Sequence, residues 1–177
     1  MHYSAIFASR DGQTQKITEK ITSTLESLGH STTLIPLGSQ SLPFPEDLRP
    51  QRIILACPIR YGHHLREFRD FVSLHCERLN TAETAFISVN LTARKPEKST
   101  PETNSYLCKF LERSRFSPKV CGVFAGALHY PNYQWHDRLM IQLIMKMTGG
   151  PTNTKNSYEF TDWEHVEAFA RKLSDWT

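Results

Sequence analysis

Short apolar runs of β-rich composition alternate with amphipathic helical patterns along the chain, and this alternation constrains the fold more than any other feature of the sequence. The runs that predict buried strands lie at residues 3–8, 32–35, 52–57, 84–89 and 120–127. Strands that alternate with helices form parallel sheets, because each helical crossover returns the chain to the same end of the sheet. The sequence therefore predicts an α/β protein, a doubly wound five-stranded parallel sheet with helices on both faces.

Helical patterns connect these strands. A 3.6-residue period of apolar side chains predicts helices over residues 17–28 and 65–79. Thr100 and Pro101 predict the start of a third helix, because proline is well tolerated at the first helical position. A capping-box pattern at residues 161–164 predicts the start of the last helix. The Pro-rich stretch at residues 40–50 is expected to be a surface connection.

Length, composition and charge limit the class of protein. The chain has 177 residues, of which 39% are hydrophobic and 22% charged, as expected for one globular domain. Its net charge of +3 is too small to require a nucleic-acid partner. The first residues lack the basic and long apolar regions of a signal peptide, and no stretch has the roughly 18 apolar residues of a membrane span. A cytoplasmic location is therefore expected.

The cysteines predict reduced thiols rather than disulfides or a metal site. Cys57, Cys76, Cys108 and Cys121 are widely spaced and contain no C-x-x-C pair. The adjacent pair at residues 63–64 is the nearest histidine cluster, and no Cys, Asp or Glu stands at a spacing that completes a tetrahedral ligand set. No metal is expected.

The loop after the first predicted strand, residues 9–14, has the properties of an anion site. It runs directly into a helix, whose N-terminal N–H groups and partial positive charge attract anions. Gly12 allows the backbone to approach a ligand closely, and the hydroxyls of Ser9 and Thr14 can donate to phosphate oxygens. The loop has neither the triphosphate pattern nor the dinucleotide pattern, so a terminal monophosphate is expected. The alternative is that Ser9 and Thr14 only cap the helix.

Several strings of this sequence resemble one family. The pattern S-x-x-G-x-T resembles the flavodoxin phosphate loop, and strings at residues 9–14, 60–63, 89–91, 93–98 and 145–150 resemble the bacterial quinone-dependent protoporphyrinogen IX dehydrogenases. The resemblance covers nearly the whole chain. It implies a single flavodoxin-like FMN-binding domain, residues 1–177, with a long-chain insertion at strand five, residues 128–156. It also implies protoporphyrinogen IX as substrate and menaquinone or ubiquinone as electron acceptor, in haem biosynthesis.

The resemblance implies flavin contacts from four loops at the carboxyl ends of strands. They comprise Ser9, Arg10, Asp11, Gly12, Gln13 and Thr14, then Pro58, Ile59, Arg60, Tyr61 and Gly62, then Ser88, Val89, Asn90 and Leu91, and finally Gly126, Ala127 and Leu128. Tyr61 is expected to stack on the flavin ring and Arg60 to stabilise the reduced flavin. The Asn90 amide is expected at the pyrimidine end. Pro58 stands where other members usually carry Ser, and it offers neither a hydroxyl nor an N–H.

The substrate contacts expected from the sequence are Arg94, Lys95, Lys98, Tyr130 and Trp135. The three cations suit the propionates of a porphyrinogen, since arginine in particular can grip a carboxylate through two parallel hydrogen bonds. A solvated basic turn is the alternative. The two aromatic residues suit a lid over a flat macrocycle or a membrane boundary. The sequence identifies no catalytic residue.

Residues 135–147 predict a helix with an unusually thin polar stripe. Arg138, Gln142 and Lys146 share one narrow face, and apolar residues cover most of the rest. At about 1.5 Å per residue the helix is too short to cross a bilayer. It can lie at a membrane interface, cover a hydrophobic substrate, pack against a second subunit in a homo-oligomer, or belong to the core. The resemblance implies peripheral contact of residues 128–150 with the cytoplasmic face of the inner membrane.

Other function classes fit the sequence less well. Flavodoxin-type electron carriers usually present acidic faces, whereas this chain is net basic and has an apolar insert. A cofactor-free receiver domain needs acidic residues after the first strand and an aspartate after the third, where this chain has Ser9, Arg10, Cys57 and Pro58. A general FMN-dependent quinone reductase of the same fold stays open as an alternative.

Overall fold

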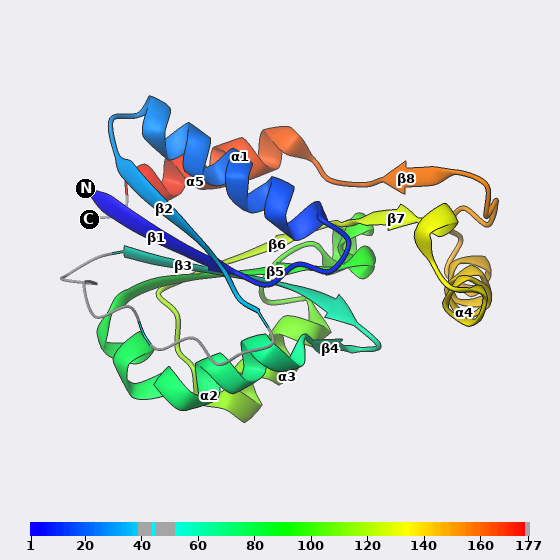
Figure 1. Cartoon of the computed structure of the whole chain (residues 1–177), viewed down its shortest axis with the longest axis horizontal. Helices are drawn as coiled ribbons and strands as arrows, with labels where there is room; N and C mark the ends of the chain where they lie inside the picture. Colours follow the sequence, from blue (N-terminus) through cyan, green and yellow to red (C-terminus); the bar gives the residue numbers. More distant parts are fainter. Residues whose placement is uncertain (39–43, 45–51, 176–177) are drawn as a thin grey trace.

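The computed structural model describes residues 1–38, 44 and 52–175 (Figure 1). The expected surface connection at residues 40–50 lies, apart from Phe44, outside these described residues. The elements in chain order are β1 (His2–Phe7), α1 (Gln13–Ser27), β2 (Ser31–Pro36), β3 (Arg52–Arg60), β4 (His63–His64), α2 (Arg66–Thr81), β5 (Glu83–Val89), η1 (Leu91–Arg94), η2 (Pro96–Lys98), α3 (Ser105–Ser114), β6 (Val120–Phe124), β7 (Ala127–His129), η3 (Tyr130–Asn132), α4 (Trp135–Met147), β8 (Ser157–Glu159) and α5 (Trp163–Ser174).

The main sheet confirms the doubly wound α/β fold. Five parallel strands lie in the order β2-β1-β3-β5-β6, and the short β4 pairs antiparallel with the end of β3. Helices α1 and α5 cover one face, and α2 and α3 cover the other (Figure 1). The strand order reverses between β1 and β3, and at such a switch point the loops diverge and leave a crevice for a ligand. The fold therefore places the loops after β1, β3 and β5 around one crevice.

Strand β3 shows why the core divides into two layers. Its alternate side chains point to opposite faces of the sheet, as the two-residue period of a strand requires. Ile54 and Ala56 join the cluster that packs against α1 and α5, whereas Ile53 and Leu55 join the cluster under α2 and α3. Both faces of the strand are apolar because both are covered by helices.

The structure corrects two expected strand boundaries. The run at residues 120–127 is not one strand, because the chain leaves the parallel sheet after Phe124 and pairs as β7 with the antiparallel β8. The run at residues 52–57 continues to Arg60, where β4 extends it into a hairpin. The partner of β7 is distant in the sequence, and the partner of the end of β3 is only two residues long. The periodicity of one segment therefore did not reveal either pairing.

Two helix starts also differ from expectation. Helix α3 begins after Asn104, whose side chain accepts a hydrogen bond from Leu107 N, so Thr100 and Pro101 lie in the preceding turn. Helix α5 is capped by Asp162, which accepts from His165 N at 3.0 Å. The hydroxyl of Thr161 is used elsewhere and donates to Ala125 O at 2.8 Å. A side chain with another partner is not available to cap a helix.

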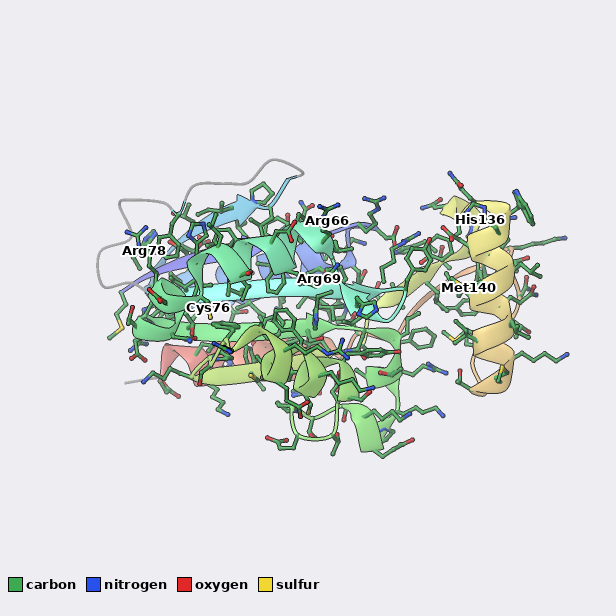
Figure 2. All side chains as sticks on the ribbon, turned by 90° about the horizontal axis from the view of Figure 1, so that it is seen from below. Arg66, Arg69, Cys76, Arg78, His136 and Met140 are labelled. Carbon is green, nitrogen blue, oxygen red and sulfur yellow. The ribbon has the colours of Figure 1, made fainter. Side chains whose placement is uncertain are left out.

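The segment from β7 to β8 forms a small layer of its own. Helix α4 stands at the far end of the molecule, beyond the carboxyl ends of the strands, and Figure 2 shows His136 and Met140 on it, far from α2. Its inner side packs through Met145 onto Leu128, Tyr130 and Tyr133. The opposite side is exposed, so the alternative that α4 is a core helix is wrong.

Candidate functional site

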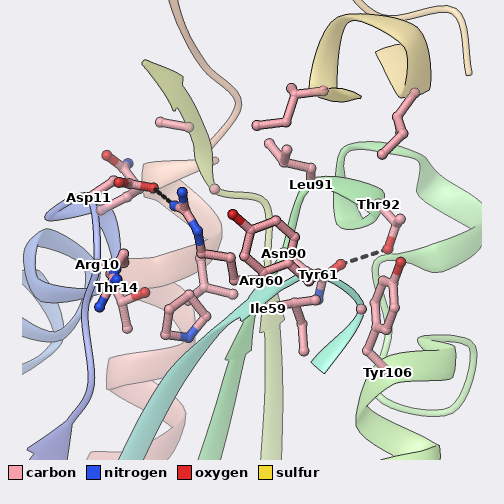
Figure 3. Close-up of a pocket in the computed structure, with 18 of the residues that line it drawn as sticks. Arg10, Asp11, Thr14, Ile59, Arg60, Tyr61, Asn90, Leu91, Thr92 and Tyr106 are labelled. Carbon is pink, nitrogen blue, oxygen red and sulfur yellow. Dashed lines mark hydrogen bonds and ion pairs between the residues drawn. The ribbon is translucent and has the colours of Figure 1, made fainter. Parts of the chain in front are cut away.

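A pocket of about 500 Å³ opens at the carboxyl ends of β1, β3, β5 and β6, with α4 on its far side (Figure 3). Its size lies in the usual range of small-molecule sites, about 300–1,000 Å³. Most residues expected to contact flavin line it, namely Ser9, Arg10, Asp11, Gln13, Thr14, Pro58, Ile59, Arg60, Tyr61, Gly62, Val89, Asn90, Leu91, Gly126 and Ala127. Gly12, Ser88 and Leu128 do not line it. The structure thus brings all four expected loops to one cavity.

The loop from β1 to α1 has unsatisfied donors. Gly12 is the N-cap of α1 at φ 84°, and no side chain caps the helix, so the alternative that Ser9 and Thr14 cap it is wrong. The Ser9 hydroxyl is buried and has no hydrogen-bond partner within the described residues. Gln13 ties the loop to the start of α5, because its Nε2 donates to Thr161 Oγ1 at 2.8 Å. A fixed loop with free donors fits a bound anion.

The segment after β3 is a tight hairpin rather than an open loop. Arg60 pairs with His63 across it, and the two central residues, Tyr61 and Gly62, have φ of 50° and 80°. Positive φ at both positions is typical of a two-residue type I′ turn, which favours Gly at the second position. Tyr61 is 62% exposed. In the sequence, the glycine that follows Tyr61 was the indication of this turn.

Asp137 of α4 contacts the hairpin and was not identified from the sequence. Arg60 donates to Asp137 Oδ2 at 3.0 Å and to Asp11 Oδ2 at 3.1 Å, the second of which is drawn in Figure 3. Tyr61 OH donates to Asp137 Oδ1 at 2.6 Å. This hydrogen bond and the Arg60 charge hold the pKa of Asp137 below its usual value. One guanidinium therefore links three segments around the pocket mouth.

The loop after β5 is fixed from beneath by a buried polar network. Asn90 Oδ1 accepts from Ala93 N, Thr92 Oγ1 and Asn104 Nδ2 at 3.1, 2.7 and 3.1 Å. The Asn90 side chain is thus occupied within the protein, and Asn90 lines the pocket together with Val89 and Leu91. Asn104 was not found from the sequence, since its partner lies in another loop.

Ser88 extends this network away from the pocket. Its hydroxyl lies 3.0 Å from His64 Nε2 and 3.4 Å from Asn90 Nδ2. His64 is surrounded by the rings of Phe68, Phe86 and Phe110. Burial lowers the pKa of His64 to about 3, so this imidazole is neutral at physiological pH.

The residues expected to contact substrate do not form one group. Arg94 lines the pocket, but its guanidinium donates to Leu91 O at 2.9 Å and to Thr148 Oγ1 and O at 2.7 and 3.1 Å. Arg94 therefore links the loop after β5 to Thr148, directly after α4. Lys95 and Lys98 lie outside the pocket lining. Tyr130 is fully buried, with its hydroxyl donating to Pro151 O, and Trp135 is 77% exposed.

The pocket wall also contains residues that sequence reasoning missed. They are Thr92, Tyr106, Tyr133, Asp137, Met140, Ile141, Ile144, Met145 and Thr148. Most belong to α4 and the turn after it, which the sequence places far from the other loops. In the sequence, the unusually apolar helix expected at residues 135–147 was the indication of this wall. Its composition alone did not decide whether the helix contacts a membrane, a substrate, a second subunit or the core. No group of His, Cys, Asp or Glu suited to a metal ion occurs among the described residues.

Comparison with known proteins places this geometry in a family. A family model described as a flavodoxin domain matches residues 5–155. The protoporphyrinogen IX dehydrogenase [quinone] of Escherichia coli K12 is 47% identical over 172 residues, which cover 97% of this chain and 94% of that protein. The chain belongs to this family of flavodoxin-fold dehydrogenases. The resemblance carried by the loop strings is thereby confirmed.

Other relatives agree with the family in name and in fold. A Leishmania major protein of the same name is 48% identical over 120 residues, covering 68% of this chain and 52% of that protein. Oxidised flavodoxin 1 of Bacillus cereus has a TM-score of 0.57 at 14% identity, covering 100% of this chain and 99% of that one. The flavodoxin of Streptococcus pneumoniae TIGR4 has a TM-score of 0.56 at 15% identity, with 100% of each chain covered. These distant structures share the fold.

The site fits the cofactor that the family indicates. A flavodoxin domain indicates FMN, whose phosphate needs several donors and whose ring needs a flat slot with backbone groups at its edge. The uncapped start of α1 and the unpartnered Ser9 hydroxyl supply donors at one end of the pocket. The exposed Tyr61 and residues 89–91 line another part of the pocket, where their backbone groups would be available to the edge of the ring.

Proposed function

We propose that this protein oxidises protoporphyrinogen IX to protoporphyrin IX with FMN as cofactor and a quinone as electron acceptor. The observation that carries the proposal is 47% identity over 97% of the chain to an enzyme of that name. The pocket supports it, because the family's loop strings at residues 9–14, 60–63 and 89–91 converge there. In each cycle a hydride and a proton leave the porphyrinogen, and the quinone becomes a hydroquinone.

The residues of this chain bind and orient the reactants. When bound, FMN supplies the chemistry of accepting a hydride and passing it on. Ser9, Thr14 and the first N–H groups of α1 would hold the phosphate. The backbone of residues 89–91 and of Gly126 would hold the ring edge, and Tyr61 would cover one face of the ring. Arg60 would place positive charge beside the reduced ring, although it shares that charge with Asp11 and Asp137.

The class of electron acceptor can be tested in an assay with protoporphyrinogen IX. FMN-loaded protein, incubated without oxygen with protoporphyrinogen IX, is expected to produce porphyrin fluorescence only when menadione or a short-chain ubiquinone is added. Fluorescence that stays at the level of the quinone-free control would contradict the proposal. Quinone reduction driven by NAD(P)H without porphyrin formation would favour the general quinone reductase. A flavin that can be reduced and reoxidised, but with neither porphyrin formation nor NAD(P)H-driven quinone reduction, would favour the electron carrier.

We also propose that α4 contacts the cytoplasmic face of the inner membrane. Its outer side exposes large apolar residues, with exposed fractions of 61% for Leu139, 58% for Leu143 and 78% for Met147. Trp135, at the start of the helix, suits the boundary between lipid and water. No helix in the described part of the chain is long and apolar enough to span a bilayer. An amphipathic helix that lies in the interface gains from burying such a surface.

Replacing Leu143 and Met147 by Ser is expected to weaken binding to phosphatidylglycerol-containing vesicles by about tenfold or more, because two large apolar side chains are lost from the contact. Neither residue lines the pocket, so FMN content should not change. Sedimentation with vesicles measures the binding. Leu74→Ser is the control, since Leu74 is 67% exposed on α2, far from α4. Equal sedimentation of the double variant and the wild type would exclude α4 as the contact.

A further inference from the structure

The pocket has two ends of different chemistry. The loop after β1 supplies the polar end, where Figure 3 shows Arg10 and Thr14 beside one another. At the other end α4 forms a wall of apolar side chains from Met140, Ile141, Ile144 and Met145. This wall faces the hairpin and the loop after β5 across the cavity (Figure 3). If FMN occupies the loops, the α4 wall is left for a second ligand.

The charges at this end favour a neutral ligand. Among the described residues that line the pocket, the cations are Arg10, Arg60 and Arg94. Arg10 belongs to the polar end. Arg60 is paired with two carboxylates, and Arg94 is hydrogen-bonded to Leu91 and Thr148. Propionates at the α4 wall would therefore lack an uncommitted cation and would approach the Asp137 carboxylate, which disfavours an anionic ligand.

The same wall reaches the molecular surface. Met140 and Ile144 line the pocket and are 38% and 50% exposed, and each stands three residues, or about one helical turn, before an exposed residue of the outer side, Leu143 and Met147. Leu143 and Met147, which are exposed but do not line the pocket, continue the apolar surface beyond them. An apolar chain can therefore run from the pocket onto the outer side of α4 without crossing a charged group of this helix face.

We propose that the α4 wall is the quinone site, with the quinone ring against Ile141 and Met145 and the isoprenoid tail leaving over Met140 and Ile144. A quinone is neutral, flat and attached to an apolar tail, which matches the lining, the charges and the continuous surface. A quinone held there would take up the hydride equivalent that bound FMN supplies and the proton released in the oxidation of protoporphyrinogen, and would leave as the hydroquinone. This inference rests on the proposed function for the identity of the oxidant.

The methionines provide a direct measure of binding. The sequence has four, of which Met140 and Met145 line the pocket, whereas Met1 and Met147 do not. In FMN-loaded protein labelled with ¹³C in the methionine methyl groups, titration with menadione should shift the Met140 and Met145 signals and leave Met1 unchanged. A short-chain menaquinone should in addition shift Met147. No shift at Met140 and Met145 at saturating quinone would overturn the site.

A variant pair tests the site by kinetics. Ile141→Asn, which makes the wall polar, is expected to raise KM for the quinone about tenfold or more while KM for protoporphyrinogen changes less than twofold. Leu74→Asn, at an exposed leucine of α2 that lies outside the pocket lining, is the matched control. Equal effects on both substrates, or protoporphyrinogen shifts at Met140 and Met145 as large as those of the quinone, would overturn the assignment to quinone.

Failure of the site and failure of the proposed function give different results. If the protein does not oxidise protoporphyrinogen but quinone still shifts Met140 and Met145, the quinone site stands and the reducing substrate is wrong. If protoporphyrinogen is oxidised with quinone but these methyl groups do not respond, the function stands and the quinone binds elsewhere.

Discussion

Replacing Gly12 by Glu is expected to weaken FMN binding by about a hundredfold or more, equivalent to about 2.7 kcal/mol. Gly12 is the N-cap of α1, and no side chain occupies the helix end. A carboxylate there would compete with the cofactor phosphate for the same N–H groups and would repel its charge. Apart from the adjoining residues of the chain, no atom lies within 4 Å of the added Cβ, so crowding is not the cause. FMN affinity is measured by quenching of flavin fluorescence.

The fold should tolerate this change. A negative charge at a helix N-terminus stabilises the helix, which offsets part of the roughly 1–2 kcal/mol that an L-residue loses at the left-handed φ of Gly12. Gly12→Asn is the matched control, because Asn adopts positive φ more readily and carries no charge. It should bind FMN within about fivefold of the wild type. A Glu variant with wild-type affinity, or an Asn variant with an equal loss, would contradict a phosphate site at this helix end.

The second large effect is a loss of stability in acid that comes from His64. Burial lowers the pKa of this imidazole from 6.5 to about 3 in the folded protein. Between these two values the unfolded chain binds a proton and the folded chain does not, so the free energy of unfolding falls as the pH falls. Above pH 6.5 the contribution is fully present. Below it the loss is up to about 1.4 kcal/mol per pH unit, or roughly 2 kcal/mol by pH 5.

His64→Gln is expected to remove this dependence. Glutamine does not titrate and can keep a hydrogen bond to Ser88, the partner of the imidazole. Urea unfolding at pH 7, 6 and 5 should give a flatter pH profile for this variant than for the wild type. His63→Gln is the control, because His63 is the exposed neighbour in the same short strand. Equal slopes for His64→Gln and the wild type would show that His64 is not the source.

The buried network explains why an acid-sensitive core residue matters for the site. His64, Ser88, Asn90 and Asn104 form a connected set of polar groups under the loop after β5. A buried polar network holds its members in fixed positions when each has a partner. We therefore expect the backbone of residues 89–91 to be rigid before any ligand binds, which reduces the entropy lost on binding.

Local patterns in the sequence determined the layers of the fold. The alternation of β-rich runs with helical periods was enough for the parallel sheet, because each pattern reflects the faces that one element must bury. The loop at residues 9–14 was also readable, since its donors and its helix are contiguous in the chain. The expected strand at residues 120–127 was wrong for the opposite reason, because β6 ends at Phe124 and Ala127 pairs with β8, about thirty residues later in the chain.

Only the tertiary structure decided how the pocket is closed. Arg60 meets Asp137 across 77 positions of sequence, and Arg94 meets Thr148 across 54. The sequence predicted Arg94 as a substrate contact, whereas in the structure its guanidinium donates hydrogen bonds to backbone and hydroxyl oxygens of the protein. Periodicity and motifs report what a residue's neighbours along the chain require. The partners of these side chains are set by the distance between loops after folding, which no local pattern contains.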